Sequence, residues 1–164
     1  MWKSGEKKDL SQQEIDLKIR NHIEQKGKVI VGTDSMLTNN RFIFVNCICL
    51  VGKESENHGR FFYKRYYNKN QENKNLLVRL MNETTDSLEI ANSIKEKFPK
   101  VSLEIHLDVN SDSRYLSNKY SNAVIGYITG CGYKYKVKPE SFAASCVADR
   151  FTRPTSSYIK KNYR

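Results

Sequence analysis

Four acidic residues stand at positions where their carboxylates could act together on a phosphodiester. Asp34 and Asp108 each end a β-prone run, and Glu83 and Asp149 lie in segments with a helical pattern. Carboxylates that converge at one point repel each other unless divalent cations bind between them, and such oxygen ligands suit Mg²⁺ or Mn²⁺. Two such ions about 4 Å apart stabilise the attacking and leaving oxygens in phosphodiester cleavage. The four acids therefore predict a site for Mg²⁺ or Mn²⁺.

The two strand acids also have ordinary structural explanations. An aspartate between two hydroxyl residues after a glycine, as Asp34 is, often caps a turn. Asp108 could cap the helix that follows it, although Asp112 is better placed for that role. A shared site requires that the fold bring the two strand ends together.

The two helix acids have alternatives of their own. Glu83 lies at the flank of the apolar stripe of its helix, where it either leans over a sheet edge or faces water. Asp149 lies near the C-terminal end of the last predicted helix, where the helix dipole disfavours an anion. Its position there calls for a partner, which is either a salt bridge with Arg150 or Arg153 or a metal ion.

The elements that position these acids follow a clear order along the chain. The first helix, 12–26, begins at a capping box formed by Ser11 and Glu14. The expected strands are 28–33, 41–52, 60–68, 101–109 and 133–138, and the later helices are 76–98, 114–129 and 140–149. Short connections predict that the first three strands form an antiparallel meander with 60–68 at an edge.

This order predicts an α/β fold with a mixed five-stranded sheet and helices on both faces. The expected strand order is 3-2-1-4-5, with strand 2 antiparallel to the rest. Asp34 and Asp108 would then lie at the C-terminal ends of neighbouring strands, about 4.8 Å apart, at the rim where such sheets bind ligands. The expected organisation is an N-terminal helical extension at 1–27, one domain at 28–153 and a basic tail at 154–164.

The charge of the chain favours a polyanionic partner. Lys and Arg number 28 against 18 Asp and Glu, a formal net charge of +10, which ranks nucleic acid ahead of an anionic membrane surface. The alternative is a generally basic surface with no dedicated partner. Since no apolar run approaches the roughly 20 residues of a membrane span and no signal peptide is recognisable, we expect a cytoplasmic protein without a membrane partner.

The four cysteines carry no metal signature. They are scattered and lack Cys-x-x-Cys spacing, so the sequence favours buried free thiols over zinc ligands and predicts no disulfide-linked partner. The cysteines are Cys47, Cys49, Cys131 and Cys146.

Three motifs give the chain a family resemblance. They are Gly-Thr-Asp-Ser at 32–35, His-Leu-Asp-Val at 106–109 and Lys-Val-Lys-Pro-Glu-Ser-Phe-Ala-Ala-Ser-Cys-Val-Ala-Asp-Arg-Phe-Thr at 136–152. Together they resemble the YkuK family of ribonuclease-H-like proteins, over about residues 25–153. The resemblance implies a ribonuclease-H-like fold whose acids come from the first strand, the first long helix after the meander, the fourth strand and the last helix. Carried over residue by residue, these acids are Asp34, Glu83, Asp108 and Asp149.

The predicted function is that of a metal-dependent nuclease acting on RNA or DNA. The four acids would be both catalytic residues and metal ligands, and Ser35, Lys138 and Arg150 are the candidate substrate-binding residues beside them. The alternative is a catalytically inactive ribonuclease-H-like module that binds nucleic acid. Tyrosines interleaved with Lys and Arg at 63–67 and 133–136 suit base stacking and phosphate contact, or reflect ordinary strand composition.

Overall fold

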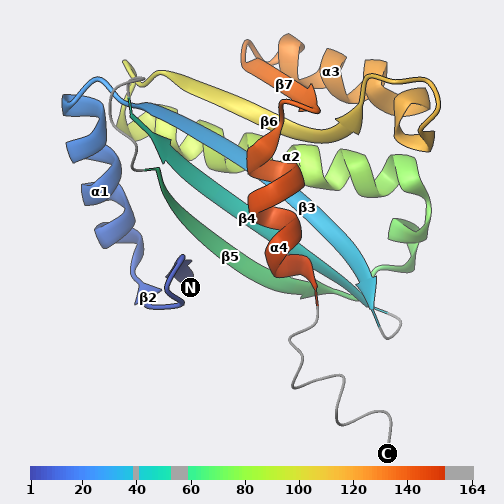
Figure 1. Cartoon of the computed structure of the whole chain (residues 1–164), viewed down its shortest axis with the longest axis horizontal. Helices are drawn as coiled ribbons and strands as arrows, with labels where there is room; N and C mark the ends of the chain where they lie inside the picture. Colours follow the sequence, from blue (N-terminus) through green and yellow to red (C-terminus); the bar gives the residue numbers. More distant parts are fainter. Residues whose placement is uncertain (39–40, 53–58, 154–164) are drawn as a thin grey trace, which may run out of the picture.

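The computed structural model describes residues 1–38, 41–52 and 59–153, which form a mixed α/β structure around one sheet (Figure 1). The basic tail expected at 154–164 lies outside these ranges. In spatial order the strands are β2 (Asp9–Leu10), β1 (Trp2–Ser4), β5 (Arg60–Asn68), β4 (Arg41–Val51), β3 (Lys28–Thr38), β6 (Leu103–Asn110) and β7 (Lys134–Lys138). β3 pairs antiparallel with β4 and parallel with β6, and most of the other strand pairs are antiparallel.

The expected five-stranded sheet is wrong in its strand count, because the first ten residues add two strands. β1 pairs antiparallel with β5, with Lys3 opposite Tyr63, so β5 is not the edge strand that its polar sequence indicated. The added strands are anchored by their apolar residues, since Trp2 and Leu10 are 8% and 4% exposed. The segment 1–27 is therefore a hairpin and a helix, and not a helical extension alone.

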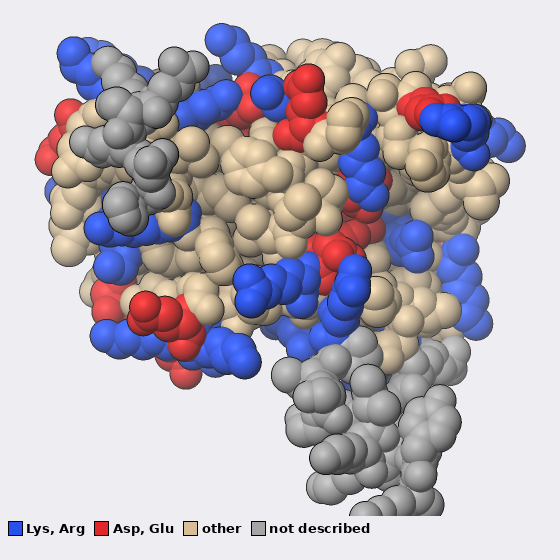
Figure 2. Space-filling model, in the orientation of Figure 1, with Lys and Arg blue, Asp and Glu red and all other residues tan. Residues whose placement is uncertain are grey.

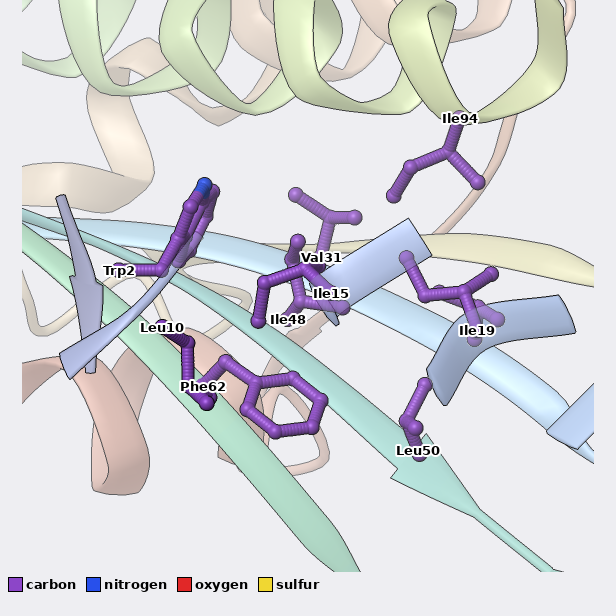
Figure 3. Close-up of a cluster of buried hydrophobic side chains, with 10 residues drawn as sticks. Trp2, Leu10, Ile15, Ile19, Val31, Ile48, Leu50, Phe62 and Ile94 are labelled. Atoms are coloured by element: carbon purple, nitrogen blue, oxygen red, sulfur yellow. The ribbon is translucent and has the colours of Figure 1, made fainter. Parts of the chain in front are cut away.

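Helix α1 (Gln12–Glu24) closes one end of the core. Its capping box is formed as expected, with the Ser11 hydroxyl accepting from the Glu14 N–H and the Glu14 carboxylate accepting from the Ser11 N–H. Ile15 and Ile19 are fully buried against the sheet, in one cluster with Trp2 (Figure 3). The apolar stripe of α1 therefore joins the N-terminal hairpin to the main core.

Three helices share one face of the sheet, and the last helical segment covers the other (Figure 1). Helices α2 (Leu76–Lys97) and α3 (Ser121–Gly130) lie on the same face as α1. Two 3₁₀ turns, η1 (Gln71–Lys74) and η2 (Leu116–Tyr120), precede α2 and α3, and η2 replaces the first part of the helix expected at 114–129. Within the described ranges, no helix is long and apolar enough to cross a membrane.

The last helical segment differs most from expectation. It begins as a π-helix, η3 (Ala143–Ala148), and continues as α4 (Asp149–Thr152), so it starts and ends later than the predicted helix 140–149. Its small residues allow it to lie directly on β3, where a Cβ added to Gly32 would lie 2.7 Å from the backbone nitrogen of Ala144. Glycine is thus required by close backbone approach at this point.

The cysteines are all free thiols, but only two of them are buried. Cys47 and Cys49 lie under η3, where the Cys47 thiol donates to the Ala143 carbonyl at 3.0 Å. Cys131 and Cys146 are exposed, which corrects the expectation of four buried thiols.

Candidate functional site

The site begins where the two central parallel strands separate. The ladder between β3 and β6 ends at the pair Gly32–His106. Beyond this pair, β3 continues beside β4, and β6 continues beside β7. Asp34 and Asp108 each lie two residues past the final pair, so their backbones flank the opening between the two strands.

Asp34 lies inside a strand and not at its end. β3 runs on to Thr38, and Asp34 is 7% exposed, which corrects the expectation of a solvent-facing rim. Burial raises the pKa of Asp34 to about 7, and the negative charges of Asp108 and Asp149 contribute to the rise. Its poorly solvated position and the neighbouring carboxylates both disfavour the ionised form of this carboxyl.

Glu83 approaches the same opening from the opposite face of the sheet. The Ser35 hydroxyl donates to Glu83 Oε1 at 2.6 Å, and Arg79 Nε lies 3.9 Å from the same oxygen. Burial raises the pKa of Glu83 well above its usual value, and the charges of Asp34 and Asp108 raise it further. Glu83 is thus a buried acid that is electrostatically linked to both strand aspartates, and not a solvated flank residue.

A small cavity of about 10 Å³ joins Glu83 to Asp108 in the opening beneath α2. Such a volume is about that of one water-sized sphere. Polar side chains contribute much of its lining, namely Thr33, Glu83, Thr84, Ser87, His106 and Asp108. Glu83 and Asp108 therefore line one small, mostly polar cavity between α2, β3 and β6.

Asp149 and Thr152 complete the cluster from the last helix. Thr152 is fully buried, and its single hydroxyl proton is shared between the Asp149 carbonyl at 2.8 Å and Asp34 Oδ2 at 3.4 Å. Asp149 lies one helical turn before Arg153, whose guanidinium donates to Asp149 Oδ2 at 3.0 Å. Asp149 thus has one of the salt-bridge partners expected for it, while its charge still acts on Asp34.

Lys138 supplies a positive charge within this group of acids. Its ammonium nitrogen lies 2.7 Å from Asp108 Oδ1. Burial lowers the pKa of Lys138, but the hydrogen bond and charge of Asp108, with the charges of Asp34 and Asp149, outweigh that effect and raise it overall. Lys138 therefore stays protonated and partly neutralises the cluster.

The three predicted substrate-binding residues occupy different surroundings. The Ser35 hydroxyl is hydrogen-bonded to Glu83 on the sheet face that α2 covers, and Lys138 forms an ion pair with Asp108. Arg150 is exposed on α4, with its guanidinium 5.9 Å from the Phe151 ring centroid. Of the three, Arg150 is the one whose charge faces solvent.

The oxygen atoms of the cluster are suitable ligands for a divalent cation, but they are not arranged as a ligand shell in this structure. All four acids offer oxygen ligands, and the mutual repulsion that raises the pKa of Asp34 is what a bound cation would relieve. Within residues 1–38, 41–52 and 59–153, however, no three His, Cys, Asp or Glu side chains already form a metal-ligand shell. Figure 2 shows acidic side chains in the middle of the face that carries the last helix, with Lys and Arg side chains beside them.

Three supporting contacts were not predicted from the sequence. Thr152 ends the motif at 136–152, three residues after Asp149, so helical spacing could have indicated it. The Ser35–Glu83 and Lys138–Asp108 pairs join distant segments and depend on how β3, β6 and β7 are placed in three dimensions.

Comparison with known proteins adds a family. A model of the family described as ribonuclease H-like matches residues 11–153, which include α1 and all four acids. Neither a curated protein nor a solved structure matches the chain.

Proposed function

The chain belongs to the ribonuclease H-like family, and from this we propose that it is a divalent-metal-dependent nuclease that cleaves RNA or DNA. The observation that carries the proposal is the position of Asp34, a buried carboxyl among the charges of Asp108 and Asp149. A chain that places acids so close together destabilises its own fold unless the site is used, because each buried like charge raises the cost of ionising the next.

We assign the binding of Mg²⁺ or Mn²⁺ to Asp34, Asp108 and Asp149, with Glu83 as the fourth ligand from the α2 face of the sheet. A divalent cation bound there would supply Lewis-acid stabilisation of charge on phosphate oxygens. The protein's own groups fix the ligands: Thr152 orients Asp34, and Ser35 orients Glu83. Because these acids lie on a sheet and two packed helices, their positions are held with little freedom.

Cationic side chains on the same sheet face support a nucleic-acid substrate. Arg65 is level with Asp34 across the sheet, since both pair with Val45 of β4. Tyr67, two residues further along β5, is 50% exposed, and the guanidinium carbons of Arg41 and Arg65 lie 4.4 and 5.6 Å from its ring centroid. A phosphate chain that crosses this face can reach both the arginines and the acids.

The direct test is cleavage of labelled single-stranded, duplex and hybrid substrates in Mn²⁺ or Mg²⁺. We expect wild-type protein to cleave at least one of them, and Asp34→Asn to lose at least about 100-fold in rate, as for removal of a charge-stabilising group. The matched control is Asp112→Asn, which removes a partly exposed acid that is paired with Arg114 nearby in the chain. Equal rates for wild type and Asp34→Asn would contradict the assignment.

A second candidate is a nucleic-acid-binding module without catalysis, and the Lys138–Asp108 ion pair favours it, since an ammonium already supplies charge where a cation is expected. The same experiment separates the two. Binding that weakens steeply with salt, without cleavage in either metal, would support this module instead.

A further inference from the structure

The carboxylate cluster is unevenly supplied with positive charge. Arg79 Nε lies 3.9 Å from Glu83, Lys138 Nζ lies 2.7 Å from Asp108, and Arg153 lies 3.0 Å from Asp149, all nearest-atom distances. Within the described part of the chain, Asp34 has no Lys or Arg ion pair and accepts hydrogen bonds from the Thr152 hydroxyl and the Ser35 N–H. Among the four acids, Asp34 is therefore the one without a Lys or Arg partner in the described ranges.

Lys138 differs from the two arginines in its place within the cluster. Arg153 is 68% exposed in its side chain, and Arg79 lies one helical turn before Glu83, with its Nε 3.9 Å from Glu83 Oε1. The Lys138 ammonium instead interacts with three of the acids, because the charges of Asp108, Asp34 and Asp149 all act on it. Its ammonium nitrogen is in direct contact with Asp108, at 2.7 Å from Oδ1.

The backbone of β7 fixes Lys138 in this place. Lys136 pairs with His106, and Lys138 pairs with Asn110, so residues 107–109 of β6 lie opposite Val137 alone. Such a bulge re-aims the side chains around it, and Asp108 lies at its centre. The Ser111 hydroxyl also donates to the Lys138 carbonyl at 3.2 Å, which ties this end of β7 to the loop after β6.

We propose that the Lys138 ammonium is a built-in cation that fills one of the two cation positions of the carboxylate cluster, so that the chain binds a single divalent ion, at Asp34. This inference rests on the proposed function, because it concerns how many ions the same site takes. An ammonium at hydrogen-bond distance from Asp108 provides a positive charge there and three N–H donors. A second divalent ion at that place would have to displace it against the attraction of the acids.

The test is the number of Mn²⁺ ions bound per chain, measured with MnCl₂ alone by calorimetric titration and by electron paramagnetic resonance of free Mn²⁺. We expect wild type to bind one ion and Lys138→Met to bind two, because removal of the ammonium opens the second position. The matched control is Lys136→Met, which removes a lysine from the same face of β7 that lies 3.5 Å from the exposed Glu140. This control should bind one ion, as wild type does.

Circular dichroism checks that each variant is folded, and Lys138→Gln replaces Lys138→Met if the latter is not. The inference would be overturned if wild type binds two ions, or if the folded Lys138 variant binds one or none. In either case, cleavage by wild type would leave the proposed function standing. An absence of Mn²⁺ binding in wild type and variant alike would contradict the proposed metal site itself, and the inference with it.

Discussion

At the scale of single residues, Asp34 is a carboxyl whose ionisation is unfavourable in the folded chain. Its carboxyl is buried, it faces other acids, and its direct support comes from Thr152 and the Ser35 N–H. Glu83 is in a similar state on the other side of the sheet, with a pKa raised by burial and by Asp34. Ionisation of either group therefore works against folding in the absence of a bound cation.

This state predicts how the metal-free chain responds to pH. Folded Asp34 takes up a proton near its pKa of about 7, whereas the unfolded chain does so near the ordinary value of 3.8. Between these values the folded chain binds more protons, so the free energy of unfolding falls as pH rises through the window. We expect urea unfolding to give a value roughly 1–4 kcal/mol higher at pH 5.5 than at pH 8, at about 1.4 kcal/mol per pKa unit.

The control for this prediction is Asp34→Asn, which should flatten the pH dependence because it removes the titrating group. The charged groups that face Asp34 come from three other elements: Asp108 of β6, Lys138 of β7 and Asp149 of α4. Glu83 of α2 acts in the same direction as Asp34. A free energy of unfolding that is as high at pH 8 as at pH 5.5, or an unchanged slope in the variant, would contradict the electrostatic picture.

At the scale of elements, the contact between β3 and the last helix sets the geometry of the cluster. We predict that Gly32→Ala lowers the free energy of unfolding by roughly 1–3 kcal/mol, as overpacking does. The added Cβ would lie 2.7 Å from Ala144 N and 3.0 Å from Ala143 C, which are backbone atoms that cannot turn aside. Displacing η3 would also move Asp149 and Thr152 away from Asp34, so cleavage should fall as well.

The matched control is Gly126→Ala in α3, where an added Cβ meets nothing within 4 Å. That change should stabilise the chain by up to about 1 kcal/mol, because alanine favours a helix interior over glycine. Chemical denaturation of both variants measures the difference. Equal stability of Gly32→Ala and wild type would show that the helix does not depend on this close approach.

Some of these elements could be predicted from local sequence patterns, and others could not. Runs of β-branched and aromatic residues predicted strands at 28–33 and 41–52, and alternation predicted the strand at 101–109. The capping box at Ser11 and Glu14 located the start of α1. These signals are all local. The hairpin at residues 1–10 was missed, since Trp2 and Leu10 are isolated apolar residues in a polar stretch and are buried by α1 and β5. The π-helix was missed because its geometry arises from packing on Gly32 and β4.

The sequence predicted that the four acids converge, but it did not predict their surroundings, and their role as site residues stays a prediction. Strand order was enough to bring Asp34 and Asp108 near each other, and Glu83 lines a small cavity with Asp108 on the α2 face of the sheet. The extension of β3 to Thr38, which buries Asp34, was not expected, because polar residues after Gly32 resemble a turn. Pairing with β4 over the whole length of β3 overrides that local preference.

At the scale of the whole molecule, one sheet separates two environments. Three helices and the N-terminal hairpin bury the larger core on one face, and the last helical segment packs on the other (Figure 1). Acidic side chains in the middle of the face that carries the last helix lie among Lys and Arg side chains, on a chain with a net charge of +10 (Figure 2). A basic surface around an acidic centre suits a polyanion whose reacting phosphate is approached through a bound cation.

The most direct test of the central claim is thermal unfolding with and without Mn²⁺, for wild type and Asp34→Asn. Without the ion, we predict a higher midpoint for Asp34→Asn, because the variant lacks the buried charge. With Mn²⁺ at about 100 times its dissociation constant, the wild-type midpoint should rise by roughly 5–10 °C, and that of Asp34→Asn should stay in place. A wild-type midpoint that does not move, or an equal rise in both proteins, would contradict a cation site centred on Asp34.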